Sequence, residues 1–511
     1  MVSAVLFITF FVLLVLNVPI AVCLGLSSAA AILYSGTSLT IVATNIYSGI
    51  SKFLLLAIPF FVLSGNIMAK AGISTRLIRF VDTCVGHRKG GIANVCIIVA
   101  CFFGAISGSG PATVAALGAV LIPAMVERGG FSAAFSTALM ATSSSIAIVI
   151  PPSIAFVVYA SITGVSIGDM FMAGIIPGIL MGLALVVVVM LEVRRNHVMP
   201  SNVEKASAKE RWNAFKDAFW GFLMPIIILG GIYGGFFTPT EAAAVSVVYG
   251  LFVGMVIYKE VKFKDLWEIL IDSAKTTGGI MLIVACASLF SFVCTRFGIS
   301  TAASELLARV ASNQFTFLLI CNIIFLIAGC FIDANSAMYI FIPIMLPVCK
   351  ALGYNVIAFG IMATVNLAIG QVTPPVGVNL FVAIGIKLRD GIRVTLQEIS
   401  RAVVPMVAAS IAILLIITYI PQISTCLPAA LGSVAAIEND ETVGGDSGTT
   451  QTDNDDFNTI GDYSDLDWAD MTWNFTCSTT ETSTWAQAGR KFGELMEQAT
   501  GGKVKVDVYA A

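Results

Sequence analysis

The chain has 511 residues, of which 57% are hydrophobic and only 12% are charged. A soluble domain carries about a quarter charged residues, so this composition excludes a soluble globular protein and indicates a polytopic membrane protein with room for roughly a dozen spans of about 20 residues. The net charge of −3 combines two unlike parts, an apolar part with basic loops and an acidic tail. No basic patch points to a nucleic-acid partner.

Apolar runs taken in chain order predict the membrane spans. The first run lacks a basic leading segment and a cleavage site, so it indicates a membrane helix rather than a signal peptide, and one or two crossings remain open. The predicted uninterrupted spans are residues 1–34, 53–71, 170–191, 219–237, 242–258, 279–294 and 402–420.

The loops between these spans set the orientation. Lys and Arg concentrate in the loops at 74–90, 192–216, 259–264 and 387–401. The positive-inside rule places these loops in the cytoplasm. We therefore expect the acidic C-terminal tail to lie outside the cytoplasmic membrane.

Residues 104–123 break the apolar pattern. This stretch holds several helix-breaking or hydroxyl-bearing residues, namely Ser107, Gly108, Ser109, Gly110, Pro111 and Thr113. Broken backbone at membrane depth is tolerated only where it is buried in protein or lines a polar cavity. The stretch therefore predicts a re-entrant hairpin that forms half of a transport site, and the alternative is a Gly/Ser-rich surface for close helix packing.

The pattern recurs in the second half of the chain. Residues 315–347 form a second broken apolar region, and helices at 131–160 and 356–386 are interrupted at Pro151-Pro152 and Pro374-Pro375. The spacing from Pro123 to the first proline pair is 28 residues, and the spacing from Pro347 to the second pair is 27. This predicts an internal repeat.

The two copies should be inverted. The loop after the opening span of the first copy is strongly basic, whereas its counterpart at 300–314 has only Arg309, set against Glu305. Inverted repeats with paired broken helices indicate a secondary transporter whose site lies near the membrane midplane.

Four elements should meet at that site: the tips at 107–113 and 333–336, and the breaks at 143–153 and 366–379. They offer carbonyls, hydroxyls and amides, which suit Na⁺, while half-helix N-termini suit an anion. Asp333 is costly inside the membrane, so we expect it at or beside a cation site, and the alternative, which is compatible, is that it caps the returning half-helix. For Glu241 we prefer a helix-capping role in Thr238-Pro239-Thr240-Glu241 over proton transfer.

Five motifs resemble the large membrane subunit of tripartite ATP-independent periplasmic (TRAP) transporters. They are SGSGPATVAALG at Ser107, IPPS at Ile150, GGFFTPTEAAAV at Gly234, FIDANSAM at Phe331 and TPPVGVNLF at Thr373. The resemblance covers residues 1–421. It implies an all-α, inverted-repeat, elevator-type transporter that couples Na⁺ to the import of a carboxylate such as a C4-dicarboxylate, keto acid or sugar acid, with no organic cofactor.

The resemblance also implies site residues and partners. We expect the Na⁺ sites to involve Ser107, Ser109, Ser144, Asp333, Ser336 and Thr373. We expect substrate contacts from Ser107, Gly108, Ser109, Thr113, Ser145, Asn335, Asn366 and Asn379. The expected partners are a small four-helix TRAP membrane subunit on a separate chain, a periplasmic substrate-binding protein and the lipid bilayer of a bacterial or archaeal cytoplasmic membrane.

The C-terminal part departs from the family pattern. Residues 422–471 are expected to form an acidic flexible linker, with eleven Asp and Glu and no Lys or Arg between Glu438 and Asp470. Residues 472–511 predict strand, helix at 484–500 and strand at 504–509, a short βαβ fragment that looks like the start of a TRAP substrate-binding protein. We expect a natural fusion that is cut short.

Two other functions compete with Na⁺-coupled transport. An intramembrane serine protease could use Ser109, but His87 and His197 lie in or beside the cytoplasmic basic loops, far from a nucleophile at membrane depth. A passive channel is the second alternative, and dependence of uptake on a Na⁺ gradient would decide it. The sequence names neither the substrate nor the ion stoichiometry.

Overall fold

The computed structural model describes residues 1–16, 18–195, 205–310, 313–386, 394–431, 471–477, 492 and 504–510. The chain divides into two compact units, Met1–Gly444 and Gly445–Ala511. Parts of the predicted basic loops at 192–216 and 387–401, most of the predicted linker and nearly all of the predicted helix at 484–500 lie outside the described residues.

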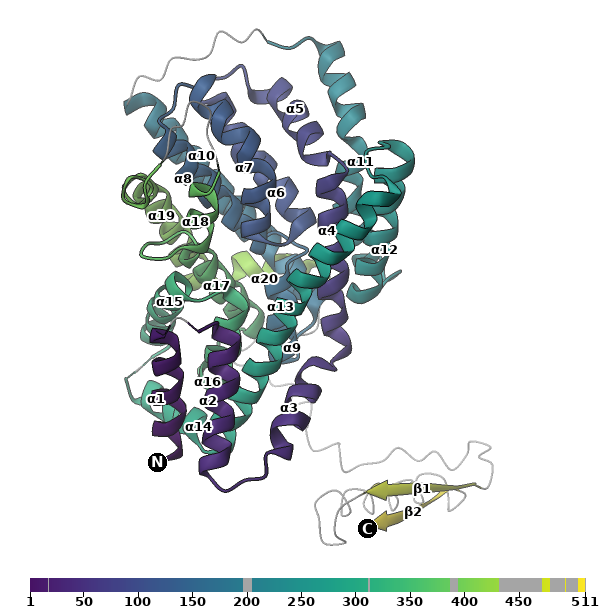
Figure 1. Ribbon diagram of the computed structural model, residues 1–511, viewed down its shortest axis with the longest axis vertical. Coiled ribbons are helices and arrows are strands. Elements are labelled where there is room, and N and C mark those ends of the chain that lie inside the picture. Colours follow the sequence, from purple (N-terminus) through teal and green to yellow (C-terminus); the bar gives the residue numbers. More distant parts are fainter. Residues whose placement is uncertain are drawn as a thin grey trace, which may run out of the picture. The chain divides into compact units, whose positions relative to one another are not determined.

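The first unit is helical throughout its described part (Figure 1). Nine of the described helices are long and apolar enough to cross a bilayer, which confirms an all-α polytopic membrane protein. In the first half the helices are α1 Val2–Val15, α2 Ile20–Tyr34, α3 Thr40–Ile50, α4 Ala57–Lys70, α5 Ile73–Val85, α6 Gly91–Ser107, α7 Gly110–Glu127, α8 Ala133–Ser145, α9 Ile154–Thr163 and α10 Ile167–Arg195. In the second half they are α11 Ala208–Tyr233, α12 Pro239–Phe252, α13 Phe263–Arg296, α14 Ile299–Val310, α15 Gln314–Phe331, α16 Ala334–Ala351, α17 Val356–Gly370, α18 Val378–Ile384, α19 Leu396–Tyr419 and α20 Gln422–Ala430.

The N-terminal apolar run is two helices. Helix α1 ends just before Pro19, and α2 begins immediately after it and packs along α1 (Figure 1). Proline lacks the N–H that would continue the first helix, so it marks the boundary. Residues 1–34 therefore form two helices, and the number of membrane crossings that they make stays a prediction.

Two stretches predicted as loops are helices. Helix α5 covers most of the loop predicted at 74–90, and α14 covers most of its counterpart at 300–314. Helix α5 buries Ile73, Leu77 and Val81, which are spaced four residues apart and therefore share one face. The loop prediction was wrong because the charged outer face of an amphipathic helix lowers its mean hydropathy, although its apolar residues still recur with a helical period.

The element order confirms the internal repeat. Each half contains a long helix, a left-handed glycine, an amphipathic helix, a helical hairpin, a buried central helix, a break at a cis proline pair, a short helix and a final span. In the first half these are α4 to α10, with Gly72 as the left-handed residue, and in the second they are α13 to α19, with Gly298. Helices α8 and α17 are buried on all sides, as expected for the centre of a membrane protein.

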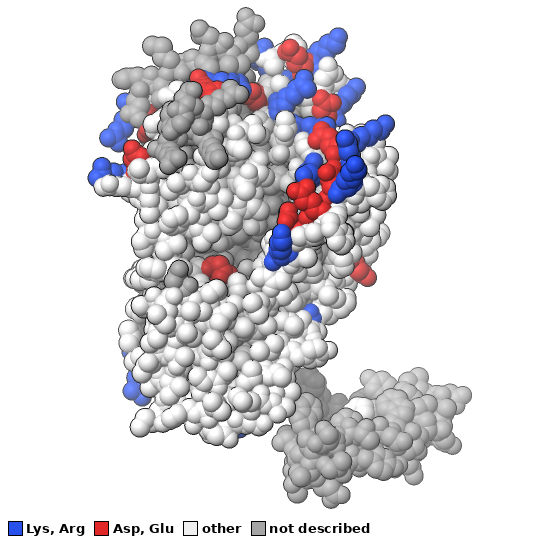
Figure 2. Space-filling view, viewed as in Figure 1, with Lys and Arg blue, Asp and Glu red and all other residues white. Residues whose placement is uncertain are grey.

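The inversion is visible in the membrane unit. Figure 1 shows α5 near one end of this unit and α14 near the other. Figure 2 shows Lys and Arg side chains gathered at the end where α5 lies, whereas the end near α1, α2 and α14 carries few charges among the described residues. The charge distribution supports our expectation that the α5 end faces the cytoplasm.

The predicted capping box at Glu241 forms. The backbone N–H of Thr238 donates to Glu241 Oε2 at 2.8 Å, and the N–H of Glu241 donates to Thr238 Oγ1 at 3.3 Å. These two bonds satisfy groups at the start of α12 that have no partner within the helix. The geometry accounts for Glu241 without a role in proton transfer.

The second unit contains two described strands. Strand β1 (Met471–Cys477) pairs in parallel with β2 (Val504–Ala510), in a register that places Met471 opposite Val504. Parallel neighbours need a long crossover connection, which agrees with the βαβ pattern read from the sequence. Helix α20 occupies the first residues of the predicted linker and packs on α10 of the membrane unit.

Candidate functional site

The first hairpin turns where glycine and hydroxyl residues replace the apolar pattern. Helix α6 ends at Ser107, Gly108 takes the left-handed conformation with a φ of +59°, and α7 begins at Gly110. The hydroxyls of Ser107 and Thr113 lie 2.8 Å apart, and Thr113 also donates to the carbonyl of Ser109 at 2.8 Å. The predicted re-entrant tip is therefore present, with its hydroxyls drawn together.

The first helix break lies against this tip. Helix α8 ends at Ser145, and the chain passes through the cis Pro151-Pro152 pair before α9 begins at Ile154. A Cβ placed on Gly108 would stand only 2.9 Å from the carbonyl oxygen of Pro152. The tip and the break are thus in backbone contact, and only glycine allows this approach.

Hydroxyls at the end of α8 bond back to their own helix. Ser144 Oγ donates to the carbonyl of Ala141 at 2.7 Å, and Ser145 Oγ donates to that of Thr142 at 2.8 Å. The Ser143 side chain is fully buried and lies beside the Cys96 thiol of α6. Each bound hydroxyl keeps oxygen lone pairs that can accept a bond or hold a cation.

The second hairpin turns at Asp333. Its Oδ2 accepts from the N–H groups of Asn335 and Ser336 at 3.1 and 3.2 Å, and its Oδ1 accepts from the Ser336 hydroxyl. Asp333 therefore caps α16, as one of the two sequence interpretations proposed. The side chain of Asp333 is partly exposed, and it lies at a hairpin tip of the apolar, helical first unit.

The second break lies against the second hairpin. The Gly377 N–H donates to the carbonyl of Cys330 at 3.3 Å, and a Cβ on Gly370 would stand 2.5 Å from the carbonyl carbon of Gly329. Thr373 Oγ1 donates to the carbonyl of Ile369 at 2.7 Å and is partly exposed beside the proline pair. The pairing of tip and break seen in the first half is therefore repeated.

The two halves meet at the start of α7. A Cβ on Gly110 would lie 2.8 Å from Asn379 Nδ2 and 3.0 Å from Gln371 Oε1, so the second break packs directly on the first hairpin. Asn379 Nδ2 also donates to the carbonyl of Ala141 in α8, at 3.5 Å. The first tip, the first break and the second break thus lie in one connected region, and the second break also contacts the end of α15, just before the second tip.

Asn366, a predicted substrate contact, takes part in a different hydrogen-bond network. Its Nδ2 donates to Asn322 Oδ1 at 2.6 Å, and Asn322 bonds to Thr418 in α19. These contacts join α15, α17 and α19. Asn335, by contrast, lies at the second tip, where its N–H donates to Asp333.

Sequence reasoning did not name Gln371 or Ser143 as individual site residues, although both lie within the predicted breaks. Gln371 lies against Gly110 across the halves, and Ser143 lies buried at the end of α8. Gln371 was detectable as an amide three residues before the second proline pair.

The donor set of this region consists mainly of neutral oxygens. Carbonyls released at the breaks, the hydroxyls of serine and threonine, and one carboxylate are hard ligands, which suit an alkali cation. In the described ranges, no group of three or more His, Cys, Asp or Glu side chains could hold a metal ion. The residues therefore fit Na⁺, with Asp333 as the single charged ligand candidate.

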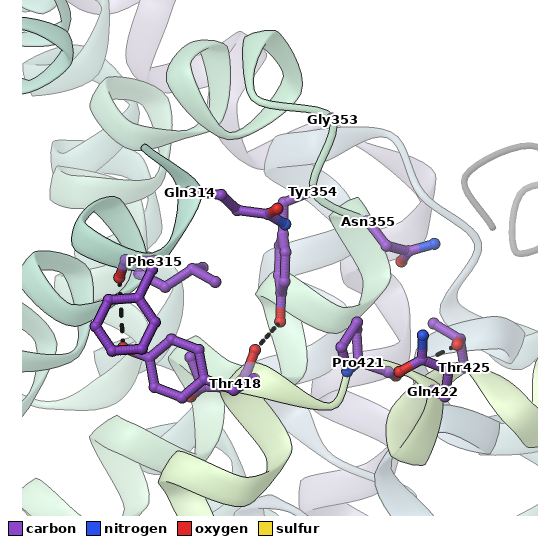
Figure 3. Close-up of a pocket in the computed structure, with 11 residues that line it drawn as sticks. Gln314, Phe315, Gly353, Tyr354, Asn355, Thr418, Pro421, Gln422 and Thr425 are labelled. Carbon is purple, nitrogen blue, oxygen red and sulfur yellow. Dashed lines mark hydrogen bonds between the residues drawn. The ribbon is translucent and has the colours of Figure 1, made fainter. Parts of the chain in front are cut away.

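A separate cavity lies at the other end of the second hairpin (Figure 3). It has a volume of about 230 Å³ and lies between the start of α15, the α16–α17 loop and the end of α19. Tyr354 donates to the carbonyl of Thr418 at 2.9 Å across it, and Phe315 stacks on Tyr419. None of the predicted site residues lines this cavity, so it is distinct from the region of the four interruptions.

Comparisons with known proteins identify relatives for most of the chain. A family model described as "Tripartite ATP-independent periplasmic transporter, DctM component" matches residues 7–423. The C4-dicarboxylate TRAP transporter large permease protein DctM of Rhodobacter capsulatus is 38% identical, over 82% of this chain and 97% of that protein. Its namesake from Pseudomonas aeruginosa is 41% identical, over 80% of this chain and 94% of that protein.

Two further comparisons bear on function and fold. The isethionate TRAP transporter permease protein DctMQ of Oleidesulfovibrio alaskensis is 40% identical, over 82% of this chain and 65% of that protein. The crystal structure of the YdaH transporter of Alcanivorax borkumensis matches with a TM-score of 0.53 at 14% identity, over 79% of this chain and 89% of that one. This structural likeness supports the fold alone.

Proposed function

The chain belongs to the DctM component family of tripartite ATP-independent periplasmic transporters, which are secondary transporters of organic acids, and from this membership we propose that it couples Na⁺ to acid import. Because members of this family are transporters, the alternative of an intramembrane serine protease is rejected. One observation carries the proposal: each hairpin tip contacts the helix break of its own half, and the halves meet at Gly110. This arrangement brings backbone carbonyls, hydroxyls and a half-helix N-terminus close together.

We assign the two ligand classes to different groups within this region. Na⁺ would be held by Ser107, Ser109 and Ser144 in the first half, and by Asp333, Ser336 and Thr373 in the second. The acid would be met by the N-terminal turns of α7 and α16 and by nearby hydroxyls and amides, since no described Lys or Arg side chain forms an ion pair with the tips or breaks.

The helix contacts also suggest how the site moves. Helices α6–α10 and α15–α20 pack mainly on one another, and α1–α5 and α11–α13 form a second packed group. In an elevator mechanism the first group would carry the site across the membrane against the second. Such rigid-body movement is a common way for inverted-repeat transporters to alternate access.

We propose two protein partners and one location. The family name describes a tripartite, periplasmic system, so we expect a small membrane subunit and a periplasmic substrate-binding protein to complete the transporter. The named substrates of the relatives, C4-dicarboxylates and isethionate, are organic anions. We propose that this chain imports such an anion across a bacterial cytoplasmic membrane, with its C-terminal tail outside.

Uptake in proteoliposomes tests the proposal. The full chain is reconstituted with its small subunit, and the acid is supplied with its binding protein. We expect accumulation of the acid against its own gradient when Na⁺ is high outside, and loss of accumulation when K⁺ replaces Na⁺. Downhill flux that ignores Na⁺ would instead support a passive channel and would reject the proposal.

A further inference from the structure

Two buried amides at the second break each have an oxygen that lacks a hydrogen-bond donor. The side chain of Gln371 is 6% exposed and that of Asn379 is fully buried. Gln371 Oε1 and Asn379 Oδ1 have no partner among the described residues. An unpaired buried acceptor is unfavourable, so each of these oxygens is expected to receive a donor when the transporter works.

Both amides face the beginning of α7. The position of a Cβ on Gly110 lies 3.0 Å from Gln371 Oε1 and 3.0 Å from Asn379 Oδ1. Helix α7 has 18 residues, and its leading N–H groups have no partner within the helix. The two free oxygens and the positive end of a helix dipole therefore point at one place.

The contacts of Asn379 decide which of its atoms is free. Its Nδ2 donates to the carbonyl of Ala141 at 3.5 Å, and its main-chain N–H donates to the carbonyl of Gln371 at 3.1 Å. These bonds hold the amide between α8 and the second break. They leave Oδ1 as the atom that can serve a ligand.

The chemistry at this place selects a particular donor. The N-terminus of α7 favours an acidic group. The Na⁺ of the first half is assigned to Ser107, Ser109 and Ser144, which leaves the two amide oxygens to a hydrogen-bond donor. A carboxylate offers only acceptor atoms to the two amide oxygens, so it cannot satisfy them. A hydroxyl group is a neutral donor and can satisfy an amide oxygen while the acid group lies at the helix end.

We infer that Gln371 and Asn379 form an acceptor pair that recognises a hydroxyl group of the transported acid. The substrate class is then hydroxylated organic acids rather than unsubstituted ones. This inference rests on the proposed transport of an organic acid and adds the group by which the membrane subunit discriminates among acids.

Binding of matched acids to the membrane part tests the inference. The full chain is purified with its small subunit and without the binding protein, so that only the membrane site discriminates. Dissociation constants are measured by calorimetry in saturating Na⁺ for malate and succinate, lactate and propionate, isethionate and ethanesulfonate, and gluconate and hexanoate. We expect the hydroxylated member of at least one pair to bind about tenfold more tightly or better.

Substitutions then locate the effect. Gln371→Leu should reduce the preference to about threefold or less, because it removes one acceptor from the ligand hydroxyl. Gln371→Met, of similar length, should do the same, and retained binding of the unsubstituted acid shows that a variant is folded. Asn94→Leu is the matched control, since Asn94 Oδ1 is also buried without a partner but lies in the first turn of α6, and it should keep the wild-type preference.

The outcomes separate this inference from the proposed function. Equal binding within every pair, or a preference that survives both Gln371 variants, overturns the acceptor pair and leaves acid transport standing. Failure of all eight acids to bind overturns the inference alone, whereas uptake in proteoliposomes that ignores Na⁺ overturns the proposed function and the inference with it.

Discussion

At the second hairpin tip, the carboxylate of Asp333 both caps a helix and carries a negative charge. The bonds from Asn335, Ser336 and the Ser336 hydroxyl explain why a short polar residue begins α16. They do not explain why that residue is charged, because Asn caps a helix about as well as Asp. The charge is the feature that points to a cation.

Substitution of Asp333 separates capping from cation binding. Asp333→Asn keeps a capping oxygen but removes the charge, so we expect little change in melting temperature and Na⁺ binding about tenfold weaker or worse. Na⁺-dependent thermal stabilisation of the purified chain with its small subunit measures both. Asp333→Ala should lose stability as well as affinity, and an unchanged Na⁺ affinity in Asp333→Asn would show that the residue is only a cap.

Glu241 gives the opposite prediction. Its carboxylate closes the capping box with Thr238, and the box accounts for both of its recorded partners. Glu241→Ala should lower the melting temperature modestly and leave the Na⁺ and pH dependence of uptake unchanged, whereas Glu241→Gln should retain the cap. A change in pH dependence in both variants would reveal a proton-carrying role.

At the scale of elements, the first hairpin and the first break act as one body because of a backbone contact. The φ of +59° and the carbonyl of Pro152 both require glycine at position 108. A side chain there would push the tip away from the break. The contact therefore fixes the relative position of the oxygens assigned to Na⁺.

Gly108→Ala tests this contact. We expect a large loss of Na⁺-dependent uptake, because the new Cβ would stand 2.9 Å from the Pro152 oxygen in addition to the left-handed cost of about 1–2 kcal/mol. Gly164→Ala is the matched control, since Gly164 has a φ of +80° but no atom within 4 Å of the new Cβ. It should lose stability only, and equal losses of uptake in both variants would assign the effect to backbone conformation rather than to the contact.

The second half offers the corresponding test. Gly370→Ala would place a Cβ 2.5 Å from the backbone of Gly329, so α15 and α17 must move apart, at a cost of about 1–3 kcal/mol. Gly278→Ala in α13 meets no atom within 4 Å and should stabilise the helix by up to ~1 kcal/mol. Melting temperature and Na⁺ affinity are measured for both, and a Gly370→Ala variant with unchanged values would remove the contact from the account.

The ends of helices were predictable from the sequence where glycine and proline residues cluster. The glycine and proline clusters at Gly108, Pro151 and Pro374 located the first tip and both breaks, because several such residues in a row disfavour a continuous helix. The amphipathic helix α5 was missed, and α13 begins at Phe263, sixteen residues before the span predicted at Gly279. A hydropathy run records only apolar segments, so it shortens helices that carry polar residues at one end or along one face.

At the scale of the whole molecule, the inverted repeat brings distant segments together. The spacing of prolines indicated two copies, and the difference in loop charge indicated their inversion, so the broad architecture was predictable from sequence. The contact of Gly110 with Gln371 and Asn379 was not predictable, because it depends on how two halves pack across more than 260 residues of chain. The placement of Asn366 in a network with Asn322 and Thr418 depends on the same packing.

The central claim is that one region formed by both halves binds Na⁺ and the acid together. Two ligands that share one region must change each other's affinity by the same factor. The most direct measurement is calorimetry of acid binding to the full chain with its small subunit, at several Na⁺ concentrations, together with the Na⁺ affinity measured with and without the acid. The account predicts that each ligand tightens the other by the same factor of about ten or more, and that Asp333→Asn reduces this factor, whereas acid binding that is indifferent to Na⁺ would contradict it.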